Sequence, residues 1–192
     1  MFYLYLHDYI LNLGGVMHIL LSISGRERTG IVRDVAESLL NIHANIEDSS
    51  MTALRGRFTM MLIVNLDANS SFGELKASLA ELEQRTGLTV QSQQLSEDEV
   101  NHVPLEPDCV VTVSGADKPG IVHAVSDVLA SLDVPIVDVS TQSRESEQGD
   151  MYMMALEAVS GEHVDAMQDA LRKTSKKLGV DIQVHALEGA IL

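Results

Sequence analysis

A nine-residue stretch occurs twice in this chain and determines how the rest of the sequence is interpreted. The first copy reads Ser24-Gly25-Arg26-Glu27-Arg28-Thr29-Gly30-Ile31-Val32, and the second, ninety positions later, reads Ser114-Gly115-Ala116-Asp117-Lys118-Pro119-Gly120-Ile121-Val122. The same offset aligns Ile46 with Ile136, and after a loop three residues longer in the second copy, residues 58–61 align with 151–154. Self-similarity at a fixed spacing indicates a repeated structural unit. The chain is therefore predicted to hold two copies of one module.

Each copy shows the same succession of apolar patterns. A short β-rich run is followed by apolar residues at helical spacing, beginning at Ile31 in one copy and Ile121 in the other. Two strands, a second helix and a last strand follow, and Ser71 and Glu74 have capping-box spacing at the start of the second helix. The strands are expected at about 18–24, 45–52 and 58–66 in the first copy and at about 109–114, 136–143, 151–158 and 180–184 in the second.

This order of elements, β-α-β-β-α-β twice, is that of the α+β ferredoxin-like fold. We expect each copy to form a four-stranded antiparallel sheet with two helices on one face. Residues 96–106 are acidic and contain proline, which is typical of a linker, so the modules are predicted to span 17–95 and 107–192. Residues 1–16 form an N-terminal extension, which is either an extra strand or translation from an in-frame start upstream of a native Met17. The second interpretation is favoured because Met17 directly precedes the first strand.

Composition excludes several classes of function. Thirteen Lys and Arg stand against 28 Asp and Glu, a net charge of −15, whereas a protein that grips nucleic-acid phosphates needs clustered cations. The single cysteine, Cys109, excludes an intrachain disulfide and any multi-cysteine metal site. No Lys or Arg precedes Arg26, so a secretory signal is not expected, and the early apolar run is too short to span a membrane. A cytoplasmic protein is expected, with no membrane or direct nucleic-acid contact.

The ferredoxin-like fold hosts unrelated functions, so the site must be argued from residues. A copper chaperone needs a thiol pair in the first loop, and neither loop contains cysteine. An RNA-recognition sheet needs stacking aromatics with basic neighbours, which the third strands lack. An acylphosphatase needs an arginine-bearing phosphate loop after the first strand, but Arg26 and Arg28 have no strict equivalent in the second copy. A non-enzymatic protein without cofactor or metal is predicted, and a small hydrolase remains a weaker alternative.

The repeated loop is the remaining candidate site. In the second copy, Pro119 suits the first turn of a helix and Gly120 allows a close approach to the backbone. Free backbone N–H groups at such a helix start can hold a carboxylate. At this point the sequence resembles the ACT family of small-molecule-sensing modules, whose signature here is an Asp-x-Pro-Gly-apolar turn. The resemblance covers about 17–95 and 107–187, and the tandem pair is similar to the glycine cleavage system transcriptional repressor group of ACT proteins.

The resemblance implies both a ligand and a mode of assembly. ACT modules pair side by side, so a homodimer is expected, and a small amino acid such as glycine or serine binds between the first loop of one module and the second strand of its partner. Carried onto this chain, the ligand-binding residues are Asp117, Lys118, Pro119, Gly120, Ile121, Ile136, Val137 and Asp138 in the second copy and Glu27, Arg28, Thr29, Gly30, Ile31, Asn45 and Ile46 in the first. The first copy departs from the signature, because Glu27 replaces Asp and Thr29 replaces Pro.

Two further features bear on partners. Met60 with Met61, and Met153 with Met154, point to opposite faces of a strand, so one methionine of each pair is expected in the core and the other on the open sheet face. The acidic surplus is concentrated between residues 106 and 192, with 15 acidic and 6 basic residues, which favours a protein partner with a basic face. The resemblance to the repressor group implies that this partner is a transcription regulator. The competing hypothesis is a ligand-free interaction module whose sheet faces and methionines mediate assembly. His123 is the histidine nearest to the predicted site.

Overall fold

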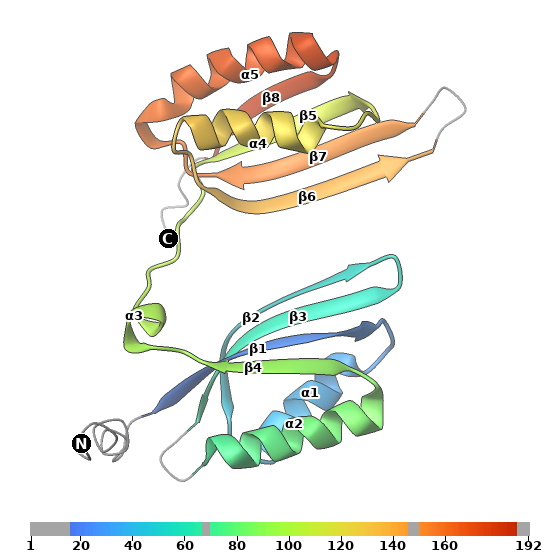
Figure 1. Ribbon diagram of the computed structural model, residues 1–192, viewed down its shortest axis with the longest axis vertical. Helices are drawn as coiled ribbons and strands as arrows, with labels where there is room; N and C mark the ends of the chain where they lie inside the picture. The colour runs from blue at the N-terminus through green and yellow to red at the C-terminus, as the bar shows by residue number, and fades with distance from the viewer. Residues whose placement is uncertain (1–15, 67–69, 146–149, 188–192) are drawn as a thin grey trace, which may run out of the picture. The chain divides into compact units, whose positions relative to one another are not determined.

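The computed structural model describes residues 16–66, 70–145 and 150–187. The chain divides between His102 and Val103 into two compact units, which we call module 1 and module 2 and describe one at a time (Figure 1). The expectation for residues 1–16 lies outside the described residues, except for Val16.

Both modules have the predicted order of elements. Module 1 contains β1 (Met17–Arg26), α1 (Ile31–Leu40), β2 (Asn45–Leu54), β3 (Arg57–Leu66), α2 (Phe72–Thr86) and β4 (Thr89–Gln94). Module 2 contains β5 (Cys109–Ala116), α4 (Ile121–Ser131), β6 (Ile136–Arg144), β7 (Met151–Ala158), a 3₁₀ turn (Gly161–His163), α5 (Val164–Leu178) and β8 (Asp181–Ala186).

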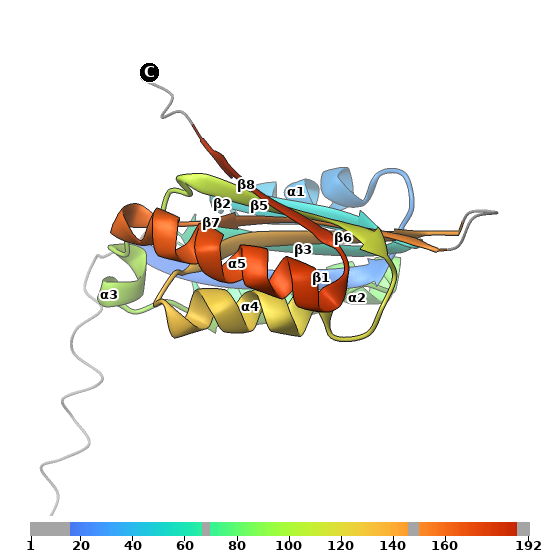
Figure 2. The ribbon, with the colours of Figure 1, turned by 90° about the horizontal axis from the view of Figure 1, so that it is seen from above.

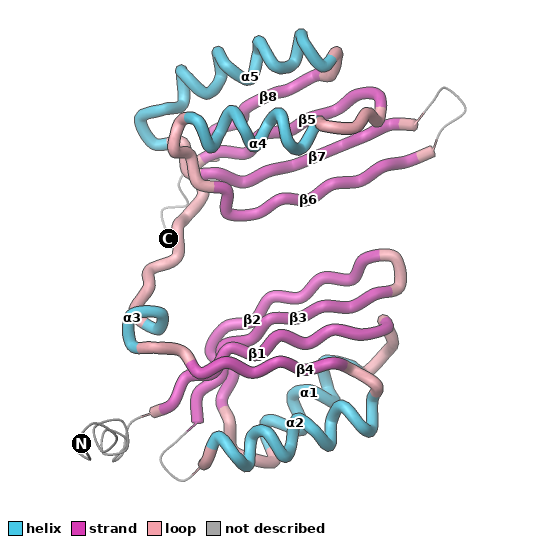
Figure 3. Tube along the Cα trace, viewed as in Figure 1, coloured by secondary structure: helices cyan, strands magenta, loops and turns pink. Residues whose placement is uncertain are grey.

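Each module is a four-stranded antiparallel sheet. The strand orders are β2-β3-β1-β4 and β6-β7-β5-β8, so the two first strands occupy equivalent inner positions. Both helices of a module lie on one face of its sheet (Figure 3), and the view down onto module 2 shows α4 and α5 running side by side (Figure 2). The predicted α+β ferredoxin-like fold is confirmed for both modules.

Alternation along the inner strands builds the two cores. In β1 the side chains of Ile19, Leu21 and Ile23 are fully buried, and the residues between them face the other side of the sheet. In both first helices the apolar residues at helical spacing face the sheet. These buried helix residues are Ile31, Val35 and Leu39 in α1 and Ile121, Val125 and Leu129 in α4. Each module therefore has a core of its own, as expected for a duplicated unit.

The second helix of module 1 starts at the predicted capping box. The Ser71 hydroxyl accepts a hydrogen bond from the Glu74 backbone N–H at 3.1 Å, and the Glu74 carboxylate accepts one from the Ser71 backbone N–H at 2.8 Å. The serine N–H lowers the pKa of Glu74, because it stabilises the charged carboxylate. The helix ends at Gly87, which adopts a left-handed conformation at a φ of 69°. The capping-box prediction is confirmed.

The strand register corrects the alignment of the third strands. Phe58 pairs with Gly25 and Tyr152 pairs with Gly115, so Phe58 and Tyr152 are the equivalent residues. Aligning 58–61 with 151–154 was wrong by one residue, and the loop is four residues longer in the second copy, not three. Two adjacent methionines in each strand had concealed the shift.

The prediction that one methionine of each pair lies in the core and the other on the open sheet face is nevertheless confirmed. Met60 and Met154 are the equivalent pair and are buried at 6% and 2% exposure. Met61 and Met153 are exposed and lie on the opposite face of their sheets. Adjacent strand residues point to opposite faces, so neither pair can converge on one metal ion.

The outer strands β2 and β6 are exposed along their whole lengths. Each contains a bulge at the same place, between Ile46 and Asp48 and between Ile136 and Asp138. Met51 is 52% exposed although its cross-strand neighbour Met60 is buried. Each module therefore has an outer strand whose apolar side chains are not covered within that module.

The predicted linker region contains a short helix. This helix, α3 (Glu97–Val100), begins at a second capping box formed by Ser96 and Glu99. Near the end of the connection, the Asp108 carboxylate accepts hydrogen bonds from the Ser160 and Gly161 backbone N–H groups, each at 2.7 Å. Burial alone would raise the pKa of Asp108, but these N–H groups lower it. Asp108 is thus bound firmly to module 2.

Candidate functional site

In each module the first strand leads into the first helix through a glycine with a positive φ. Gly30 has a φ of 89° and Gly120 a φ of 93°, a conformation that other residues adopt only with strain. Each glycine is the N-cap of its helix and has no side chain that could cap it. The N–H groups of the first helical turn are therefore left for another acceptor, at the positive end of the helix. The two loops have the same backbone design.

The residue type of Pro119 predicted a place in the first helical turn, and this prediction is wrong. Because Gly120 is the N-cap and α4 begins at Ile121, Pro119 lies one residue before the cap. Its fixed φ restricts the loop just before the left-handed glycine. The proline thus shapes the entry to the helix and is not part of it.

Two side chains hold the module 2 loop in place. The Asp117 carboxylate accepts a hydrogen bond from the Ser143 hydroxyl of β6 at 2.6 Å. The Lys118 ammonium donates to the Leu178 carbonyl, at the end of α5, at 3.2 Å. The loop is therefore fixed to the outer strand on one side and to the second helix on the other.

A hollow of about 420 Å³ opens next to this loop. It is lined by Lys118, Gly120, Ile121, Val122, His123 and Tyr152. His123, singled out from the sequence as the nearest histidine, is one of the lining residues, and the exposed Val122 side chain supplies apolar surface. The hollow combines an uncapped helix start, a cation and apolar walls.

Tyr152 is the most unusual residue of this hollow. Only 9% of it is exposed, and its hydroxyl makes no hydrogen bond of standard geometry with any residue in the described part of the chain. Burial raises the pKa of Tyr152, and the negative charge of Asp117 adds to the rise, while the nearby Thr141 side chain opposes it. A buried polar group without a partner costs free energy, and such groups in native proteins often await a ligand or water.

The module 1 loop is organised around a buried carboxylate. The Asp34 side chain, 8% exposed, accepts hydrogen bonds from Arg28 Nη2 at 2.6 Å and from Arg33 Nη2 at 2.8 Å. The Arg33 guanidinium, followed by that of Arg28, lowers the pKa of Asp34 to about 2. The hollow beside this loop is smaller, about 160 Å³. Its lining residues are Glu27, Arg28, Gly30, Ile31, Val32, Arg33, Met51, Ala53 and Phe58.

The predicted second-strand residues do not join the loops within one module. Asn45 pairs with Asn65 of β3. Phe58 of β3, which pairs with Gly25 beside the loop, is seven residues away from Asn65. At about 3.3 Å per residue the separation is roughly 23 Å. Ile46 lies at that far end with Asn45, and Ile136, Val137 and Asp138 occupy the corresponding end of β6. A complete site of the predicted kind therefore needs the strand of another module.

Several site residues escaped the sequence analysis. Ser143 and Tyr152 could not be placed at the loop without the strand register, and the alignment error concealed Tyr152 further. Arg33 and Asp34 did carry a signal, because the ninety-residue offset matches them with His123 and Ala124. That change from a charged pair to a histidine and an alanine is visible in the sequence but acquires meaning only once Asp34 is seen to be buried.

Comparison with protein families gives the same division of the chain. The family model of the ACT domain matches residues 17–93 and again residues 108–185. The chain belongs to the ACT-domain family. The two ACT domains coincide with modules 1 and 2, and the resemblance noted in the sequence is confirmed at the level of the family.

The matches with curated relatives cover a stretch of this chain about as long as one ACT domain. A UPF0237 protein of Methanopyrus kandleri is 37% identical over 70 residues, covering 36% of this chain and 78% of the relative. A UPF0237 protein of Methanosarcina mazei is 38% identical over 77 residues, covering 39% of this chain and 80% of the relative.

Two solved structures match both ACT domains together. A protein of Galdieria sulphuraria, solved as an unknown protein, is 28% identical with a TM-score of 0.75, covering 91% of this chain and all of that one. A protein named provisionally as a glycine cleavage system transcriptional repressor is 19% identical with a TM-score of 0.65, covering 91% of this chain and 99% of that one. At that identity the second match establishes a common fold.

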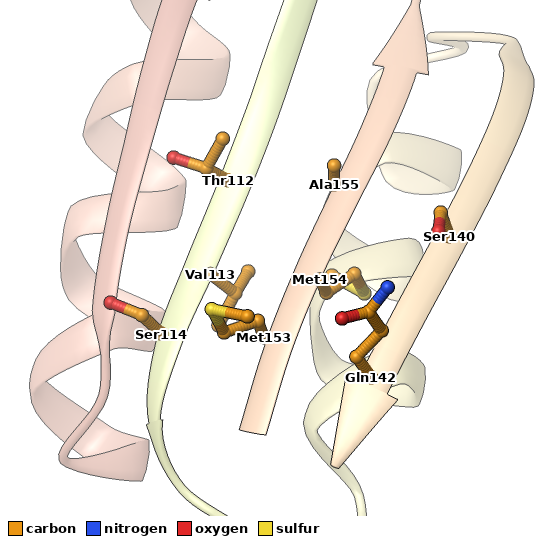
Figure 4. A pocket seen from close by; sticks show the side chains of 8 residues that line it. All are labelled: Thr112, Val113, Ser114, Ser140, Gln142, Met153, Met154 and Ala155. Carbon is orange, nitrogen blue, oxygen red and sulfur yellow. The ribbon is translucent and has the colours of Figure 1, made fainter. Parts of the chain in front are cut away.

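The open face of the second ACT domain's sheet has a shallow hollow of its own, of about 340 Å³ (Figure 4). Figure 4 shows the side chains of Thr112, Ser114, Gln142 and Met153 on the face away from the helices. The surface is mixed, with hydroxyl and amide groups around an exposed methionine, which suits adaptable contacts.

No group of three or more His, Cys, Asp or Glu side chains in the described ranges is placed to hold a metal ion. Among the helices described in the structure, none is long and apolar enough to cross a membrane.

Proposed function

We propose that this chain is a non-enzymatic regulatory protein that binds a small amino acid at its ACT loops and thereby changes its affinity for a protein partner. The observation that carries the proposal is the module 2 loop, where the uncapped start of α4 lies beside Lys118 and an open hollow.

The chemistry of the module 2 loop suits an α-amino acid. A ligand carboxylate would accept hydrogen bonds from the first-turn N–H groups of α4 and interact with the Lys118 ammonium. The ligand ammonium would pair with the Asp117 carboxylate, which Ser143 already orients. Val122 and Tyr152 leave apolar room for a small side chain, so we propose glycine or a serine-like amino acid as the ligand.

We propose that the site is completed by a second module in a homodimer. The exposed outer strands support this, because a long uncovered edge with apolar side chains such as Met51 and Val139 tends to pair with another chain. The far-end residues Ile136, Val137 and Asp138 would then face the loop of a neighbouring module. Antiparallel pairing of outer strands brings opposite ends of two sheets together, which is the geometry that this site requires.

The regulated partner is proposed to be a cytoplasmic protein with a basic face, such as a transcription regulator. The net charge of −15 supports a protein partner and disfavours direct contact with nucleic acid. The fold shared with a provisionally named glycine cleavage system transcriptional repressor makes glycine metabolism the first pathway to test. The amino acid controls the partner only if it binds the free and the partner-bound states with different affinity.

A thermal-shift panel of the twenty amino acids tests the ligand proposal. A ligand that binds only the folded chain stabilises it by RT ln(1 + [L]/Kd), which is about 2.7 kcal/mol at a hundredfold excess over Kd. We expect glycine or serine, and few others, to raise the melting temperature in a concentration-dependent way. If no amino acid raises it at millimolar concentration, the sensing function is wrong.

A ligand-free interaction module remains the second candidate, and the open sheet face of module 2 favours it. Met153 and its polar neighbours Gln142 and Thr112 form an exposed surface that needs no small molecule to be useful. Under this alternative, Met153→Lys would abolish partner binding, and added glycine would leave partner affinity unchanged. Glycine-dependent partner affinity would exclude it.

A further inference from the structure

The two ACT loops share a backbone but differ in how their charges are satisfied. The ninety-residue offset, which the matching glycine conformations support, equates Arg28 with Lys118 and Asp34 with Ala124. Module 1 therefore has a carboxylate on its first helix, at a position where module 2 has only a methyl group.

In module 1 this carboxylate forms ion pairs with both arginines of the loop region. Asp34 binds both Arg28 and Arg33, at 2.6 and 2.8 Å, and is itself almost fully buried. The two guanidinium groups also cover the loop glycine. A Cβ atom built on Gly30 would lie 3.5 Å from Arg33 Nη2 and 3.8 Å from Arg28 Nη1. A ligand carboxylate would have to compete for these arginines with an internal one that is already in place.

In module 2 the corresponding surface is open. No atom lies within 4 Å of a Cβ built on Gly120, and the hollow beside the loop is about 420 Å³, against about 160 Å³ in module 1. Lys118 donates to a neutral carbonyl, and no carboxylate within the described ranges forms an ion pair with it. The lysine charge is therefore held in place without being neutralised.

Each hollow is lined by one aromatic residue, and this residue is more polar in module 2 than in module 1. Phe58 and Tyr152 are equivalent by register and line the module 1 and module 2 hollows. The tyrosine adds a hydroxyl that has no hydrogen-bond partner among the described residues. Module 2 thus has a hydroxyl, close to Thr141, at the position where module 1 has a plain phenyl ring.

We propose that Asp34 closes the module 1 loop to carboxylate ligands, and that the module 2 loop alone binds the amino acid, so that each chain takes one ligand. The nature of the ligand rests on the proposed function, whereas the closure rests on the Asp34 contacts. Module 1 is then a fixed ACT domain with an internal carboxylate, and module 2 is the responsive one.

The test is a titration of the full-length, ¹⁵N-labelled protein with glycine, following the backbone amides of Gly30 and Gly120. In the native protein we expect only the Gly120 signal to move, with one glycine bound per chain by calorimetry. In Asp34→Asn, which keeps the size and removes the charge, Arg28 and Arg33 are released, so the Gly30 signal should also move and two glycines should bind.

The reciprocal variant is Ala124→Asp, which gives module 2 the carboxylate of module 1. It should weaken glycine binding at Gly120 about tenfold or more, because the new charge competes for Lys118 and repels the ligand carboxylate. Ala124→Asn is the matched control for bulk and should bind within about threefold of the native protein, a difference of well under 1.4 kcal/mol. The dispersion of the amide spectrum reports whether each variant is folded.

The outcomes separate the two proposals. Movement of both glycine signals in the native protein, with two ligands bound, would overturn the closure by Asp34 and leave the sensing function intact. No movement in the native protein but movement of Gly30 in Asp34→Asn would support the closure by Asp34, but it would overturn binding at the module 2 loop and with it amino-acid sensing by the native chain. No movement in either protein, or equal affinity in Ala124→Asp and Ala124→Asn, would overturn the further inference.

Discussion

Asp34 and Ala124 occupy the same position on the first helices of the two modules, and this one difference separates the two loops chemically. Asp34 is buried yet ionised, because two arginines supply hydrogen bonds to both of its carboxylate oxygens. A buried carboxylate without such donors would take up a proton and become neutral. The pair of arginines is thus tied to the helix and is less available to a ligand.

The pH dependence of stability tests the state of Asp34. Its pKa is lowered from 3.8 to about 2, so its contribution to stability is fully present above about pH 4 and is lost as the pH falls towards 2. We expect the difference in unfolding free energy between the native protein and Asp34→Asn, measured by urea denaturation, to be constant above pH 5 and to shrink between pH 4 and pH 2.

Taking the difference in unfolding free energy between the native protein and Asp34→Asn cancels the contributions of the other carboxylates. The pKa values of Glu74, Glu99 and Asp108 are lowered too, but they titrate equally in both proteins and cancel in the difference. A difference that stays constant down to pH 2 would show that Asp34 is not ionised through its arginine contacts.

At the scale of elements, the helices and strands were largely predictable. Period-two and helical patterns located all four strands of module 2, and the capping box located the start of α2, because local chemistry dominates at these places. The strand register was not predictable, since neighbouring methionines such as Met153 and Met154 fit either register equally well. For the same reason Tyr152, a residue of the candidate site, was misplaced.

The helices α2 and α3 both start with a serine–glutamate capping box, so the contribution of each helix to stability can be compared. Ser71→Ala removes the cap of α2, which buries Leu75, Leu79 and Leu82, so we expect it to lower the unfolding free energy of module 1 by about 1 kcal/mol. Ser96→Ala removes the equivalent cap of α3, which buries no residue, and should change stability by less than about 0.5 kcal/mol.

Chemical denaturation monitored by circular dichroism makes this comparison. Equal losses in the two variants would mean that α3 contributes to the folded core as much as α2 does. A loss confined to Ser71→Ala would agree with the burial pattern of the two helices.

At the scale of the whole molecule, duplication has produced two ACT domains with different surfaces. The second domain has most of the acidic surplus, the larger loop hollow and the hollow on the open sheet face around Met153. The repeat alone predicted the loop residues, whereas Asn45 and Ile136 lie at the ends of their strands far from those loops. A contact between modules leaves no periodic pattern within one chain, so sequence periodicity does not bear on the proposal that these residues meet the loop of another module.

The most direct test of the central claim is a calorimetric titration of the full-length protein with glycine and serine, in the native form and in two glycine variants. Gly120→Ala strains the module 2 loop at a φ of 93°, and Gly87→Ala imposes similar strain at a φ of 69° at the end of α2 in module 1. We predict saturable binding to the native protein and to Gly87→Ala, and at least about tenfold weaker binding to Gly120→Ala. Absence of saturable binding to the folded native protein at millimolar ligand, or equal affinity in all three proteins, would contradict amino-acid sensing at the module 2 loop.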